Sequence, residues 1–140
     1  MEEPIRILCV DDEAFMLSSL RRFFLDDDFE ILTAASAREG LAVMRRHAPV
    51  QLILSDYRMP EENGLEFLRQ VAGAWPDTVG MILSGYADLS AISRALENRE
   101  VFRFIAKPWE VAELKTAIAE AIAFYRDRRS ITASQPRPSA

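Results

Sequence analysis

The sequence predicts an α/β protein with a (βα)5 pattern, in which five parallel strands form a doubly wound sheet. Two features of the chain predict this class. Short runs rich in β-branched and aromatic residues alternate with stretches in which apolar residues recur every three or four positions. Several of the short runs are apolar continuously and not alternately, which is typical of parallel strands covered by helices on both faces.

The strands are expected in the runs IRILCV, FEILTA, VQLILS, TVGMILS and VFRFIA, at residues 5–10, 29–34, 50–55, 78–84 and 101–106. Each run is about as long as an ordinary strand, and each is rich in the residue types that strands prefer. The first, third and fourth runs are continuously apolar, so we expect helices to cover both of their faces.

Helices are expected between these strands and after the last one. Four of them are indicated by Leu17, Leu20 and Phe24; by Ala37, Leu41, Met44 and Ala48; by Leu65, Leu68, Ala72 and Trp75; and by Leu89, Ile92 and Leu96. The fifth is expected from about Glu110 to Arg128, because apolar residues repeat there at steps of three and four. Ser36 and Asp88 are suitable helix N-caps, and Pro49 and Pro76 follow helix ends, since proline cannot continue a helix.

A single domain is expected to account for most of the chain. The chain has 140 residues, 49% of them hydrophobic, which is enough for one core. We expect this domain to span residues 1–129. In SITASQPRPSA, Ser, Pro and Ala replace the apolar period, so residues 130–140 are expected to be a disordered tail or the start of a linker.

Composition excludes several classes of function. Seventeen Lys and Arg residues against 22 Asp and Glu residues give a net charge of -5, so we expect no direct binding to nucleic acid or to an anionic membrane. The single cysteine, Cys9, cannot form an internal disulfide, which fits a reducing compartment. MEEPIR lacks the features of a signal peptide, and no apolar run is long enough to span a bilayer. We therefore expect a cytoplasmic protein.

Five charged or reactive side chains lie at the ends of the expected strands. Strand ends supply Asp11 and Asp12, Asp56, Ser84 and Lys107, and the carboxyl ends of parallel strands share one edge of a sheet. Three carboxylates there would repel one another by roughly 4 kcal/mol per pair at about 4 Å, so a cation should compensate. Oxygen ligands suit Mg²⁺, or Mn²⁺, better than zinc. Taken alone, Asp12 could instead be a helix N-cap, and Ser84 with Gly85 could be only a turn.

Asp56 is the expected nucleophile of this site. A carboxylate beside Mg²⁺ can attack phosphorus, since the metal and a lysine neutralise charge on the phosphoryl oxygens. Asp56 stands alone after its strand, whereas Asp11 and Asp12 are adjacent and better placed to hold a metal. Ser84 and Lys107 would receive the phosphoryl oxygens.

These residues resemble the receiver domain of bacterial two-component response regulators. The resemblance covers about residues 4–127 and rests on VDDE, on SDYRMP followed by a glycine, on SG and on FIAKP, in this order after or within the expected strands. It implies a flavodoxin-like fold with strand order 2-1-3-4-5. By the same resemblance the phosphorylated residue is Asp56, the metal ligands are Asp11, Asp12, Asp56 and the backbone carbonyl of Arg58, the switch residues are Ser84, Lys107 and Phe104, and the peptide before Pro108 is cis.

The resemblance also implies a mechanism and partners. A phosphohistidine of a sensor histidine kinase or phosphotransfer protein would donate to Asp56, and the fourth helix, fifth strand and fifth helix would change as the output face. Such a domain catalyses only its own phosphorylation and dephosphorylation, so it is a signalling switch more than an enzyme. Its output would be a downstream protein or a C-terminal domain beyond this chain, and a dimer through the fourth and fifth helices fits the family.

Several alternatives stay open at this point. The side chain of Arg58 could shield the acyl phosphate, guide the donor, or be merely solvated, and Trp109 could pack the last helix onto the body or be exposed as a docking anchor on the output surface. The chain could also be a pseudo-receiver that binds partners without phosphorylation, although the intact acidic, hydroxyl and lysine residues argue against this. A phosphatase of the haloacid dehalogenase type would need Asp-x-Asp after the first strand, which the chain lacks.

Overall fold

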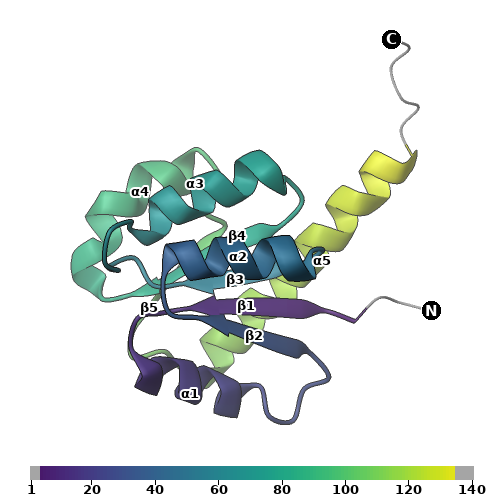
Figure 1. Ribbon diagram of the computed structural model, residues 1–140. Helices are drawn as coiled ribbons and strands as arrows, with labels where there is room; N and C mark the ends of the chain where they lie inside the picture. Colours follow the sequence, from purple (N-terminus) through teal and green to yellow (C-terminus); the bar gives the residue numbers. More distant parts are fainter. Residues whose placement is uncertain (1–3, 135–140) are drawn as a thin grey trace.

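The computed structural model describes residues 4–134, with side chains described up to residue 129, and shows a five-stranded parallel sheet in the order β2-β1-β3-β4-β5 (Figure 1). The strands are β1 (Arg6–Val10), β2 (Glu30–Ala34), β3 (Leu52–Ser55), β4 (Val79–Ser84) and β5 (Arg103–Ala106). The helices are α1 (Ala14–Phe23), α2 (Ala37–His47), α3 (Gly64–Ala74), α4 (Leu89–Glu97) and α5 (Val111–Ser134), and a short 3-10 turn, η1 (Tyr86–Asp88), precedes α4. The predicted (βα)5 fold and its strand order are confirmed.

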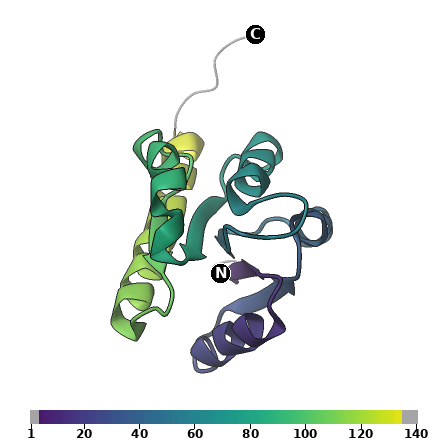
Figure 2. The same cartoon turned by 90° about the vertical axis from the view of Figure 1, so that its left-hand side faces the viewer.

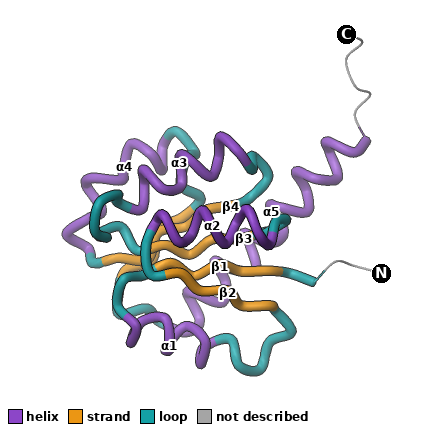
Figure 3. Tube along the Cα trace, viewed as in Figure 1, coloured by secondary structure: helices purple, strands orange, loops and turns teal. Residues whose placement is uncertain are grey.

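Helices cover both faces of the sheet, which appears in Figures 2 and 3 as a central layer between two groups of helices. Neighbouring residues of β1 point to opposite faces, as in any strand. Ile7 and Cys9 belong to the core shared with α1 and α5, whereas Leu8 and Val10 belong to the core shared with α2, α3 and α4. The continuous apolar runs of the sequence thus reflect two cores on one strand.

The ends of two helices follow from the side chains that cap them. At α2, the Ser36 hydroxyl accepts a hydrogen bond from the backbone N–H of Glu39, so the predicted cap is confirmed. At α3, Asn63 and Glu66 each accept a hydrogen bond from the other's backbone N–H, which is a capping box. These caps fix the start of α3 directly after the loop that follows β3.

The last helix is longer than the sequence predicts. α5 ends at Ser134, so the expected helix end at Arg128 and the expected domain boundary at residue 129 both lie inside it. An established helix adds residues at little cost, and no proline interrupts the sequence between Val111 and Ser134. Residues 135–140, on which the rest of the predicted tail falls, lie outside the described residues. Among the described helices, none is both long enough and apolar enough to cross a membrane.

Candidate functional site

The sheet brings the predicted residues together at the carboxyl ends of its strands. Asp11 follows β1, Asp56 follows β3, Ser84 ends β4 and Lys107 follows β5. Backbone hydrogen bonds extend the sheet into this edge: the N–H of Asp56 donates to Val10 (2.9 Å) and the N–H of Lys107 donates to Ser84 (2.9 Å). The side chains therefore stand on the most regular part of the fold, which limits how far they can move apart.

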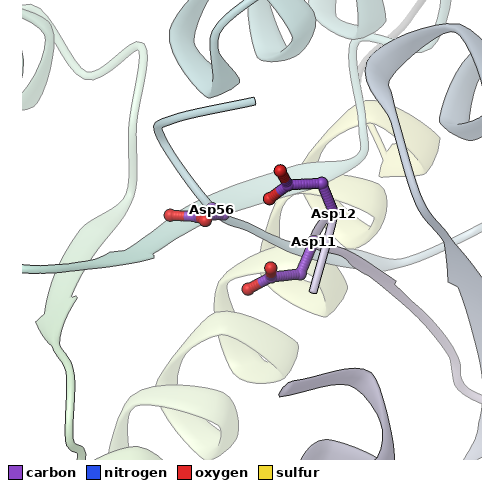
Figure 4. A group of neighbouring side chains, drawn as sticks. All are labelled: Asp11, Asp12 and Asp56. Atoms are coloured by element: carbon purple, nitrogen blue, oxygen red, sulfur yellow. The ribbon is translucent and has the colours of Figure 1, made fainter. Parts of the chain in front are cut away.

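Three carboxylates form an acidic cluster at this edge. One carboxylate oxygen from each of Asp11, Asp12 and Asp56 lies within 4.8 Å of the others, and Figure 4 shows the three side chains gathered beside the ends of β1 and β3. Asp11 is 2% exposed and Asp56 8% exposed, whereas Asp12 faces solvent. An all-oxygen donor set that is open on one side suits a divalent cation such as Mg²⁺, which keeps several of its waters.

Asp12 does not cap α1. The N-cap residue of that helix is Glu13, which makes no side-chain cap, and the backbone N–H of Glu13 donates instead to Asp11 Oδ1 (2.9 Å). The capping explanation for Asp12 is therefore excluded. This hydrogen bond also fixes the orientation of the Asp11 carboxylate within the cluster.

Among the residues that the structure describes, Lys107 supplies the positive charge next to the acidic cluster. Its Nζ lies 2.7 Å from Asp11 Oδ2 and 3.5 Å from Asp56 Oδ2. Burial opposes the charged form of this amine, but the hydrogen bond and charge of Asp11, together with the charge of Asp56, outweigh burial and raise the pKa of Lys107. Lys107 is thus held as a cation between two carboxylates.

The environment of Asp56 disfavours its negative charge. Burial is the main cause of the raised pKa of Asp56, and the neighbouring Asp11 raises it further. Lys107 and the backbone N–H of Tyr57 at 2.8 Å act in the opposite direction without cancelling the increase. The Ser84 hydroxyl, 3.1 Å away, also opposes the increase whenever its hydrogen points to Asp56. One lysine therefore compensates the three carboxylates only in part, and a bound cation would complete the compensation.

Asp88 is part of the site, although the sequence indicated only a helix cap. It occupies the N-cap position of α4 but makes no capping hydrogen bond, so that expectation is wrong. Its side chain is 4% exposed and accepts hydrogen bonds from the Ser84 hydroxyl (2.6 Å) and from Arg58 Nε (2.7 Å). These two partners compete with the helix backbone for the carboxylate, which explains the missing cap. The only signal in the sequence is its spacing, four residues after Ser84.

The charge of Asp88 is stabilised where it lies. Burial opposes ionisation of this carboxyl, but the hydrogen bonds from Ser84 and Arg58 and the charge of Arg58 outweigh burial and lower the pKa of Asp88. The side chain of Arg58 is itself 74% exposed, so the pair joins a buried anion to a cation at the surface. Arg58 is thus neither merely solvated nor directed at Asp56 in this arrangement.

Two predicted aromatic positions differ in their surroundings. Phe104 is partly buried against the core under α2, α3 and α4, and its ring centre lies 6.5 Å from that of Tyr86, which is 76% exposed. Trp109 is partly buried against the opposite core and meets Phe23 of α1 edge to face at 6.4 Å. Of the two roles considered for Trp109, the packing role is the one that the structure shows. The Lys107–Pro108 peptide is cis.

Gly64, the glycine after SDYRMP, lets α3 approach the backbone of Asp56. A Cβ at this position would lie 2.2 Å from the carbonyl oxygen of Asp56, closer than real atoms come. The N–H of Gly64 donates to the carbonyl of Tyr57 (2.8 Å), which ties the start of α3 to the same turn. This glycine therefore has a physical reason that its place in the motif alone does not reveal.

An open depression borders the acidic cluster. It lies between the loop after β3 and the start of α4, and its lining includes Asp12, Arg58, Met59, Asn63 and Asp88. Asp12 is the residue of the acidic cluster that lines it, so the depression borders the exposed side of the cluster.

These features define a receiver-type domain, and the comparisons with known proteins identify the family. Residues 7–119 match the response regulator receiver domain family. This match covers well over half of the chain. The chain therefore belongs to the response regulator receiver domain family.

The relatives are bacterial regulatory proteins that are longer than this chain. The hydrogenase transcriptional regulatory protein HoxA of Bradyrhizobium diazoefficiens is 39% identical over 120 residues, which is 86% of this chain and 24% of that protein. The transcriptional regulatory protein GlrR of Escherichia coli is 30% identical over 120 residues, which is 86% of this chain and 27% of that protein. The chain thus spans about a quarter of the length of these curated relatives.

Solved structures show the same fold. A structure described as adenylate cyclase from Rhodopirellula baltica has a TM-score of 0.86 at 32% identity, covering 95% of this chain and 100% of that one. The signal receiver domain of an HD domain-containing protein from Pseudomonas fluorescens Pf-5 also has a TM-score of 0.86, at 25% identity, covering 93% of this chain and 95% of that one. The receiver fold therefore occurs in proteins with widely different names.

Proposed function

We propose that this chain is a phosphorylation-controlled signalling switch in which Asp56 accepts a phosphoryl group in the presence of Mg²⁺ or Mn²⁺. The observation that carries the proposal is the position of Asp56: a partly compensated carboxylate with Lys107 at 3.5 Å, the Ser84 hydroxyl at 3.1 Å and two further carboxylates within reach of one cation. This set combines a nucleophile, a cation site and two groups that can bind phosphoryl oxygens.

The phosphoryl transfer needs only the donor and Asp56 as reactants. A carboxylate oxygen of Asp56 attacks phosphorus, the bond from phosphorus to the donor's imidazole nitrogen breaks, and the imidazole departs with the electron pair. A divalent cation held by Asp11, Asp12, Asp56 and the backbone carbonyl of Arg58 would neutralise charge on the phosphoryl oxygens. Lys107 binds one of those oxygens. Its contact with the Asp56 carboxylate is thereby replaced by a contact with the phosphoryl group, so the amine keeps an anionic partner.

Phosphorylation is expected to shift a pre-existing equilibrium. The Ser84 hydroxyl moves inward to a phosphoryl oxygen, and Phe104 rotates into the space that it leaves. Phe104 now contacts Tyr86, so this rotation would change the surface formed by α4, β5 and α5. We propose that this surface is the output face.

The partners follow from this chemistry. The donor is a phosphohistidine on a sensor kinase or phosphotransfer protein, presented at the open depression beside Asp12 and Arg58. Output passes to a separate protein or to a C-terminal domain, a proposal supported by the greater length of the relatives and by their names as transcriptional regulatory proteins. We further propose a cytoplasmic location, no catalysis beyond the domain's own phosphorylation and dephosphorylation, and dimerisation through α4 and α5.

The test is intact-mass spectrometry after incubation with Mg²⁺ and acetyl phosphate. We expect the gain of one acid-stable, base-labile phosphoryl group, lost in Asp56→Asn and in the presence of EDTA. Asp77→Asn is a matched control, because Asp77 lies outside the site and is paired with Arg129. If the wild type gains no adduct and beryllofluoride does not change the fluorescence of Trp109 in a Trp75→Phe background, the chain is a pseudo-receiver that acts through its unmodified surface.

A further inference from the structure

Asp88 connects Ser84 and Arg58, two residues with separate roles in the proposed phosphorylation. Its buried carboxylate accepts one hydrogen bond from Ser84 at the end of β4 and another from Arg58 in the loop after β3. No step of phosphoryl transfer to Asp56 requires Asp88. Its effect on the switch must therefore come through the groups that it holds.

Two carboxylates compete for one hydrogen atom. The Ser84 hydroxyl has a single hydrogen, so it can donate to only one acceptor at a time. Its oxygen lies 2.6 Å from Asp88 Oδ2 and 3.1 Å from Asp56 Oδ1. The shorter distance is that of a strong hydrogen bond to an ionised acceptor, so the hydrogen points to Asp88 in this arrangement.

We propose that Asp88 is a positioning residue that retains the Ser84 hydroxyl in the unphosphorylated domain and thereby sets how far phosphorylation shifts the switch. The inference rests on the proposed function, because it assumes that Ser84 donates to a phosphoryl oxygen after transfer. That donation requires the hydrogen bond between Ser84 and Asp88 to break. Asp88 then keeps Arg58, so its buried charge is not left without a partner.

Replacing the carboxylate should release Ser84. Asp88→Asn keeps the size of the side chain but removes the charge, which weakens it as an acceptor for Ser84 and abolishes the ion pair with Arg58. The hydroxyl is then free to turn toward a phosphoryl group or its mimic. We expect Asp88→Asn to bind beryllofluoride about tenfold more tightly in the presence of Mg²⁺, a change equal to about 1.4 kcal/mol.

The binding is measured as a beryllofluoride titration in excess Mg²⁺, followed by Trp109 fluorescence in a Trp75→Phe background. Glu100→Gln is the control variant, because it breaks an ion pair with Arg69 (3.0 Å) just before β5, at the other edge of the sheet from Lys107. We expect this control to bind the mimic as the parent does. Circular dichroism confirms that each variant is folded.

A double-mutant cycle separates positioning from simple charge removal. If Asp88 acts through the hydroxyl, Asp88→Asn has no effect on beryllofluoride binding when Ser84 is already alanine. If Asp88→Asn tightens binding equally in the Ser84→Ala background, the cause is the lost negative charge, and the proposal is overturned. Should Asp88→Asn not fold, Asp88→Ala gives the same cycle, since it removes the same acceptor and leaves Arg58 to solvent.

The two levels of proposal fail differently. A wild type that does not respond to beryllofluoride contradicts the proposed function itself. A wild type that responds, with Asp88→Asn no tighter than wild type, contradicts only the role of Asp88.

Discussion

Gly64 and Gly73 lie in the same helix and should respond oppositely to alanine. At Gly64 the added Cβ would lie 2.2 Å from the backbone oxygen of Asp56 and 3.0 Å from Ile82, whereas at Gly73 it would meet nothing within 4 Å. A backbone oxygen in a paired turn cannot move aside as the end of a side chain can. The two substitutions therefore differ in sterics while adding the same methyl group to α3.

The expected magnitudes follow from these contacts. Overpacking at Gly64 should lower the free energy of unfolding by about 1–3 kcal/mol. Gly73→Ala should raise it by about 0.5–1 kcal/mol, because alanine is the better helix former and Gly73 is exposed. For a domain of this size, about 1 kcal/mol shifts the melting temperature by roughly 3–6 °C. The melting temperatures of the two variants should then lie on opposite sides of the wild type.

Urea unfolding followed by circular dichroism measures both variants, with unchanged slopes showing that only stability has changed. Phosphorylation by acetyl phosphate provides a second readout, because Gly64→Ala displaces the backbone of Asp56 and should slow the reaction, while Gly73→Ala should not. A Gly64→Ala protein as stable as Gly73→Ala would show that the close approach of α3 to Asp56 is not a feature of the folded protein.

Three further predictions follow from the charges and burial of the site. Without Mg²⁺, Asp56→Asn should be more stable than wild type by about 1–2 kcal/mol at pH 7, because the carboxylates repel across about 4.8 Å while Lys107 offsets part of that repulsion. Because burial raises the pKa of Asp56, ionisation of this carboxyl costs stability only above the ordinary carboxyl range. Melting curves should therefore show the stability difference between Asp56→Asn and wild type disappearing near pH 3, and also at pH 7 when Mg²⁺ is added. A difference that persists under both conditions would refute this explanation. Lys107→Met should lower the free energy of unfolding by about 1–3 kcal/mol at pH 8. Because the pKa of Lys107 is raised, urea titrations should show this difference fully present below about pH 10 and lost as the pH rises through the raised value. A difference that is independent of pH would mean that packing, not charge, is responsible. Burial raises the pKa of Cys9 to about 12, so a thiol reagent at pH 8 should label it only after unfolding in urea, and rapid labelling of the native protein would contradict its burial.

The site was predictable because parallel strands deliver their carboxyl ends to one edge. Any chain with this pattern of periods places the residues after its strands together, so Asp56 and Lys107 could be paired from the sequence although they are far apart in it. The chemistry of these residue types then indicated a cation and a phosphoryl group.

Asp88 could not be assigned because its local pattern has two physical outcomes. An aspartate just before a helical period is ordinarily a cap, and only the positions of Ser84 and Arg58 in space turn its carboxylate inward. Trp109 was ambiguous for a similar reason, since Phe23, which it packs against, lies on a helix distant in sequence. The length of α5 was underestimated because Ser and Thr are common in loops yet are tolerated in a helix that has already formed, and because Ala is itself a strong helix former.

α5 is a long helix that starts close to the site. Its 24 residues correspond to about 36 Å at the usual rise per residue, and it starts at Val111, a few positions after the lysine of the site. The helix is packed in the core by Leu114, Ile118 and Tyr125, so it can tilt only together with the elements beneath it. A change of about 5° in its direction would displace Ser134 by about 3 Å relative to Val111, since arc length grows with the length of a rigid rod. Any rearrangement at Asp56 that tilts this packed unit would therefore be larger at Ser134 than at the site.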